Sequence, residues 1–117
     1  MEILDSAKSH FRERLAGGLR VLEVPEWEIN GEPSKIYYKS SLNFLQQEKI
    51  LKLSDEGKKA EAIVMALIER ALDADGNRIF RQANRTELMK KVDPEVISRI
   101  VGDMSGDDDS MDELEKN

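Results

Sequence analysis

The sequence predicts an α+β, mostly helical fold: a small β-hairpin, a bundle of about four helices, a separate N-terminal helix and a disordered acidic C-terminal tail. Three observations predict it. Apolar residues recur with helical spacing in several segments, one short stretch is rich in β-forming residues, and the last fifteen residues are strongly acidic. The 117 residues are enough for one domain. We divide them into a helix and Gly-Gly hinge (1–18), an α+β domain (19–104) and a tail (105–117).

The first element expected is an amphipathic helix over residues 5–16. Its apolar face has the i, i+3, i+4 spacing of a helix and comprises Leu4, Ala7, Phe11 and Leu15. Gly17-Gly18 can end the helix and act as a hinge. The single histidine, His10, lies beside the apolar face and is expected at the surface. This helix can therefore pack on its own domain or on a neighbouring chain.

A β-hairpin is expected next. Residues 19–24 form its first strand, and Pro25, which cannot donate a backbone hydrogen bond, should end that strand or lie at an edge. The turn-forming sequence at 30–33 lies in a long loop between 27 and 34, and residues 35–39 form the returning strand. Since a lone hairpin is marginally stable, helices must cover it.

The remainder of the folded region is expected to be helical. Ser40 or Ser41 caps a helix with two apolar faces, one containing Leu42, Leu45, Ile50 and Leu53 and the other Phe44 and Leu51. Residues 58–72 form the central core helix, with Glu61, Glu69 and Arg70 on its wet side. Two shorter helices follow at 85–92 and 94–104.

Few residues here could support catalysis or bind a metal. The chain has no cysteine and one histidine, and it contains no phosphate-binding glycine loop, serine elbow or His-Glu-x-x-His motif. Asp73, Asp75 and Asn77 have the first spacings of a calcium loop. However, Gly76 and Asn84 occupy the wrong positions for one, so a polar turn is expected. We predict a protein that is no enzyme, has no cofactor and acts by binding another protein.

The charge distribution separates the tail from the body. Residues 103–117 contain seven acidic side chains and one basic side chain, which accounts for the whole net charge of −6. The basic residues of the neutral body are spread evenly, and no apolar run is long enough for a membrane span, so neither nucleic acid nor membrane is an expected partner. The tail either keeps the protein soluble or binds a partner, for which Met111 and Leu114 could form one helical turn, or mimics nucleic acid.

Two motifs, in this order, carry a family resemblance. Val-Pro-Glu-Trp at 24–27 leads through a strand and an alanine-rich helix into Asp-Ala-Asp-Gly-Asn-Arg-Ile-Phe at 73–80. Residues 19–104 thereby resemble the tail assembly chaperones of long, flexible-tailed bacteriophages and prophages. The positions that match the motifs are Pro25, Trp27, Asp73, Asp75, Gly76 and Phe80.

The resemblance implies a non-catalytic role in virion assembly. Such chaperones coat the hydrophobic, helical tape-measure protein in the host bacterial cytoplasm until the tail tube polymerises, and they are absent from the mature virion. Some are also made as a longer frameshifted product that recruits the major tail-tube protein. An elongated client has room for many copies, so a homo-oligomer is expected.

Candidate partner-binding residues are the apolar side chains in excess of a simple core: Phe44, Leu51, Ala62, Met65, Ala66, Met89 and Met104. The alternative is that they only fill the core. Two other functions stay open. One is a small phage-encoded adaptor or inhibitor of a host protein that acts through the acidic tail, and the other is a structural component of the tail.

Overall fold

The computed structural model describes residues 2–15 and 18–106. It is α+β and mostly helical, as the sequence predicts. The elements, in order, are α1 (Ile3–Leu15), β1 (Arg20–Ile29), β2 (Glu32–Tyr38), α2 (Phe44–Asp55), α3 (Lys59–Arg70), the 3-10 helix η1 (Gln82–Asn84), α4 (Arg85–Lys91) and α5 (Pro94–Gly106).

Two of the predicted boundaries, the N-terminal hinge and the start of the tail, lie close to the ends of the described ranges. Ala16, the last residue of the expected N-terminal helix, and Gly17 of the expected Gly17-Gly18 hinge lie outside the described residues, and so does the predicted tail from residue 107 onward. The expected start of the tail at Ser105 is wrong, because α5 continues through Ser105 to Gly106.

The hairpin turn is tighter than expected. Asn30 and Gly31, with φ of 56° and 80°, form a two-residue turn between antiparallel β1 and β2. Positive φ at both central residues matches the right-handed twist of paired strands and is tolerated best by Asn and Gly. The long loop is therefore wrong. Of the two places expected for Pro25, the structure shows the edge: β1 continues past Pro25, which lies exposed in an irregularity of the register between Val24 and Glu28, and each strand of this two-stranded sheet is an edge.

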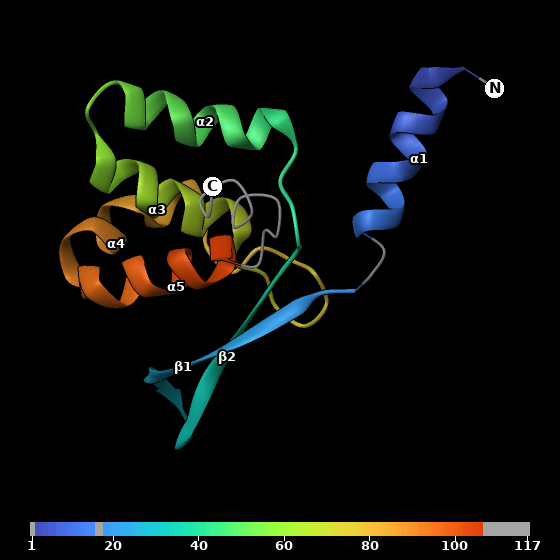
Figure 1. Ribbon diagram of the computed structural model, residues 1–117. Helices are drawn as coiled ribbons and strands as arrows, with labels where there is room; N and C mark the ends of the chain where they lie inside the picture. The colour runs from blue at the N-terminus through green and yellow to red at the C-terminus, as the bar shows by residue number, and fades with distance from the viewer. Residues whose placement is uncertain (1, 16–17, 107–117) are drawn as a thin grey trace.

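α3 is the centre of the helical body. In Figure 1, α2 lies along one side of α3, with α4 and α5 on the other, while the hairpin extends below α5 and α1 stands apart. The core combines residues from the hairpin, α3, α4 and α5: Val24, Ile36, Tyr38, Val64, Leu67, Ile68, Ala71, Leu88, Val96, Ile97, Ile100 and Met104. Thus α3 and α5 cover the hairpin, as its low intrinsic stability requires.

The chain leaves α3 by pairing with the hairpin. α3 ends at Arg70, two residues earlier than predicted, and Ala71 is extended (ψ 122°). Leu72 then exchanges two backbone hydrogen bonds with Tyr37, of 2.7 and 2.8 Å. These bonds satisfy polar backbone groups that burial would otherwise leave unpaired. They also join the helical body to the edge of the sheet.

The start of α2 differs from the prediction. Its cap is Asn43, not Ser40 or Ser41: Asn43 Oδ1 accepts from the backbone N–H of Gln46 at 2.9 Å, and the Gln46 side chain accepts in return from the Asn43 N–H at 3.2 Å. This reciprocal capping box satisfies two donors at once, which favours the later start.

Glu69 and Arg70 are also not on a wet face of α3. They are 3% and 8% exposed. Glu69 accepts hydrogen bonds from Lys49 of α2 (3.1 Å) and from Arg78 in the loop that follows α3 (2.5 Å). The two positive charges, which come from other segments of the chain, offset the free-energy cost of burying the Glu69 carboxylate.

An ion pair joins the hairpin to α5 and gives a pH-dependent prediction. Arg99 donates to both carboxylate oxygens of Glu26, one bond being 2.8 Å long, and this holds the pKa of Glu26 down at about 2, from an ordinary 4.5. A lowered pKa in the folded state stabilises the fold above pH 4.5, and the stabilisation is lost as the pH falls toward 2.

Glu26→Gln should therefore lower the free energy of unfolding modestly at pH 6, and the difference from the parent protein should shrink at pH 3. Urea denaturation at the two pH values measures it. Arg99→Gln removes the other half of the pair and should show the same convergence. A difference that does not change with pH would contradict the assignment.

Candidate functional site

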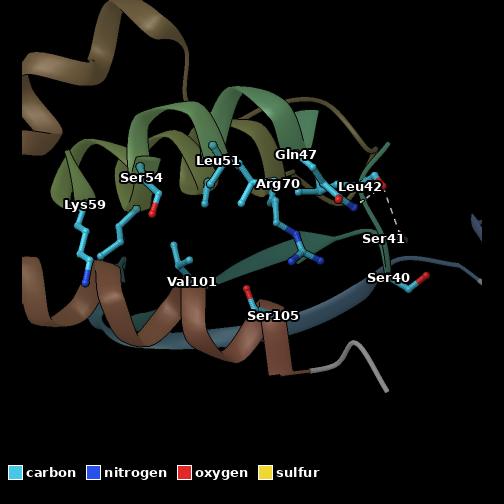
Figure 2. A pocket seen from close by; sticks show the side chains of 14 residues that line it. Ser40, Ser41, Leu42, Gln47, Leu51, Ser54, Lys59, Arg70, Val101 and Ser105 are labelled. Carbon is cyan, nitrogen blue, oxygen red and sulfur yellow. Dashed lines mark hydrogen bonds between the residues drawn. The ribbon is translucent and has the colours of Figure 1, made fainter. Parts of the chain in front are cut away.

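An apolar groove runs between α2 and α5, with α3 as its floor. Its volume is about 520 Å³, and Figure 2 shows Leu51 and Val101 on its opposite walls. We call it the α2–α5 groove. It is lined by Ser40, Ser41, Leu42, Gln47, Ile50, Leu51, Ser54, Lys59, Ala62, Ile63, Ala66, Arg70, Val101 and Ser105.

Small side chains make the groove deep. Ala62 and Ala66 are four residues apart on α3, so they lie on one helix face and leave space above the floor. Longer apolar side chains come from the walls on α2 and α5. An apolar surface that no other described segment covers favours the binding of an apolar partner.

The charged side chains that line the groove are both basic. Lys59 lies at one end in Figure 2, and the Arg70 guanidinium lies deep toward the other. Arg70 Nη2 donates to the Lys39 carbonyl at 3.0 Å, and Arg70 Cζ lies 5.8 Å from the centre of the Tyr38 ring. These interactions hold the guanidinium in place. The groove is thus lined mainly by apolar side chains, and its two charged lining residues are basic.

The groove continues onto the outer face of α2. Gln47 and Leu51 line both the groove and a shallow hollow beside Phe44. Phe44, Leu45 and Leu51 are 86%, 72% and 57% exposed. The capping box places Phe44 at the first position of α2, where its ring has no earlier helical turn to pack against. Together these residues extend the apolar surface well beyond the groove.

The structure brings together four of the seven candidate partner-binding residues. Phe44, Leu51, Ala62 and Ala66 lie in the groove or on the adjoining face. The three methionines lie elsewhere. Met65 is buried and accepts from Gln82 Nε2 at 3.2 Å; Met89, on α4, is 39% exposed; and Met104 is fully buried in the core.

Sequence reasoning did not assign Ile50, Ile63 and Val101 to the candidate site. All three line the groove, although their spacing places them on the core-facing side of their helices. For Ile50 a signal was available: its helix has two apolar faces, and such a helix needs a partner surface on each of them.

None of the motif residues lines the groove. The Trp27 and Phe80 rings meet edge to face, with centres 6.3 Å apart, and so join the hairpin to the segment after α3. Asp73 Oδ1 accepts from the backbone N–H groups of Asp75 and Asn77, both at 2.9 Å, and Gly76 adopts φ +87°. This is the expected polar turn.

Across residues 2–15 and 18–106, no group of three or more His, Cys, Asp or Glu side chains is arranged to hold a metal ion. Within the same residues, no helix combines the length and apolar character needed to cross a membrane.

No family model matches the chain, and no curated protein matches its sequence. A solved structure does match: the bacteriophage HK97 tail assembly chaperone, with a TM-score of 0.60 and 18% identity, over 86% of this chain and 95% of the HK97 chain. The chain has the fold of a phage tail assembly chaperone. This confirms the fold expected from the order of the motifs.

Proposed function

We propose that this chain is a non-catalytic tail assembly chaperone that binds apolar helical segments of a phage tape-measure protein and keeps that protein soluble. The observation that carries the proposal is the open α2–α5 groove, whose apolar lining continues to the exposed Phe44 ring. The likeness of its fold to that of a tail assembly chaperone supports the same role.

The groove suits a helical client. An amphipathic helix binds a groove through side chains that recur every three or four residues, and it exposes its polar face to water. Long apolar helices aggregate unless such a face is covered. We place this activity in the host bacterial cytoplasm, with several copies of the chain along one client. A longer frameshifted product would add the major tail-tube protein as a partner.

Co-expression with the tape-measure protein of the same phage tests the proposal. The parent chain should increase the soluble fraction of that protein. Leu51→Asp places a charge on the apolar wall, and we expect it to weaken binding by about 10-fold or more, because burying an unpaired charge costs over ~1.4 kcal/mol. Pull-down of the tape-measure protein measures the loss.

Ile29→Asp is the matched control. Ile29 is 66% exposed, like Leu51, but it lies in the hairpin, away from the groove. It should bind as the parent does. If Ile29→Asp is equally defective, the groove is not the binding site; if the parent leaves the tape-measure protein insoluble, the proposed function fails.

The predicted absence from the finished particle has its own test. Mass spectrometry of purified virions should detect this chain only at trace levels. Stoichiometric amounts would instead favour a structural component of the tail.

A further inference from the structure

We propose that, in the free protein, the α2–α5 groove is occupied by the acidic segment 107–117 of the same chain, with Met111 and Leu114 against the groove floor. The docking itself is independent of any client. Its regulatory consequence, that a tape-measure helix must displace the segment, rests on the function proposed above.

The first argument is position. Ser105 lines the groove, and α5 ends one residue later at Gly106, so segment 107–117 begins beside the groove. Eleven residues can span about 36 Å when extended. The floor, formed by the 12 residues of α3, is only about 18 Å long. The segment can therefore turn back at Ser105 and extend toward Lys59 at the opposite end (Figure 2).

The second argument is charge. Segment 107–117 carries six acidic residues and one basic residue. The groove offers Lys59 and Arg70 as its charged lining residues. Opposite charges across a partly buried surface favour binding of the acidic segment to the groove and disfavour the binding of basic segments.

The third argument is the pattern of apolar residues. Met111 and Leu114 are three residues apart, so a helical turn at this segment would place both on one face and Asp112 and Glu113 on others. Methionine is flexible enough to fill an irregular space such as the one above Ala62 and Ala66. Two such anchors match a short groove better than they match the extended outer face of α2.

The other occupant available in this sequence is α1 of a second copy. Its exposed residues include Ile3 and Leu4, at 89% and 62%. However, α1 carries Lys8, Arg12 and Arg14 against only Asp5 and Glu13, so it would bring net positive charge to a basic groove. The acidic segment is the better match.

Docking of the segment would regulate the site. A tethered segment competes with a free client at an effective concentration of about millimolar. The groove would then remain covered until a client with more apolar anchors arrives, which keeps copies of the chaperone from associating through their grooves. Weakening the docking should raise the apparent affinity for the client several-fold.

NMR with a spin label on the full chain tests the docking directly. The chain contains no cysteine, so Asn117→Cys provides a single attachment site without altering an acidic residue. We expect loss of amide signal intensity at Ser54 and Lys59, the end of the groove far from Ser105, and little loss at Gly31 in the hairpin turn. In the full chain, the pair of substitutions Met111→Ser and Leu114→Ser should restore the groove signals.

A second sample identifies the occupant. Isotope-labelled chain without a spin label is mixed with spin-labelled chain at natural abundance, so that any signal loss must come from another copy. Loss in the mixture equal to that in the single sample would overturn the proposal in favour of a second copy. Equal loss at Gly31 and Lys59, or no loss at Lys59, would overturn it outright.

No client is present in these samples, so they remain informative if the chain binds no tape-measure protein. Conversely, if the parent binds the client and the double serine variant binds it no more tightly, the regulatory consequence is wrong while the proposed function stands.

Discussion

A Leu67→Ala variant is expected to lose about 2–5 kcal/mol of unfolding free energy, the range typical of large-to-small changes in a packed core. Leu67 is fully buried on α3 and belongs to the core cluster that joins the hairpin to α4 and α5. Its removal leaves a cavity among elements that are already fixed in place. Because a domain of this size is stabilised by only about 5–15 kcal/mol, chemical denaturation should show the loss clearly.

Leu45→Ala is the matched control, since it makes the same substitution within a helix. Leu45 is 72% exposed on α2, and the change should alter the free energy of unfolding by no more than about 0.5 kcal/mol. Equal losses at the two positions would contradict the assignment of α3 as the centre of the core.

The second large effect is expected at Glu69. Glu69→Ala should cost about 2 kcal/mol, less than the 3–5 kcal/mol typical when one partner of a buried ion pair is removed. The reason is exposure: the Glu69 side chain is fully buried, whereas Lys49 and Arg78 are 56% and 46% exposed and can be hydrated again. Urea denaturation at pH 7 measures the change.

Glu61→Ala separates the effect of burial from that of ion pairing. Glu61 is also on α3 and accepts from an arginine, Arg85, at the same 2.5 Å, but its side chain is 32% exposed. Exposed pairs contribute about 0–1 kcal/mol, so the loss should be smaller than at Glu69. A loss at Glu61 as large as at Glu69 would mean that burial does not determine the cost.

Local patterns predicted most of the fold. The periodic apolar residues place α3 and α5 within two residues of their observed ends, and Asp73 forms the expected turn. The predictions were wrong where the burial of a residue or the end of a helix depends on residues far away in the sequence. A helix pattern gives Glu69 and Arg70 no reason to be buried, because Lys49, Arg78 and the Lys39 carbonyl come from elsewhere in the chain. The early end of α3 likewise depends on pairing between Leu72 and Tyr37.

The candidate site was predicted only in part, for a related reason. The excess of apolar side chains on α2 and α3 is visible in the sequence, and Phe44, Leu51, Ala62 and Ala66 follow from it. Which face of α5 meets the core is a matter of packing, and this buries Met104 while Val101 lines the groove. Apolar periodicity identifies the apolar face of a helix, but it does not show which residues at the border of that face point into the core.

The backbone pairing between Tyr37 and Leu72 has a consequence for the order of events during synthesis. The hairpin leaves the ribosome before the segments that cover it, because α3 and α5 are made 21 or more residues after Tyr38. A domain whose early part depends on a later part forms few stable contacts until that later part has been made. The apolar face of the nascent hairpin therefore remains exposed until α3 and α5 have been made, and the packing of α5 completes the fold.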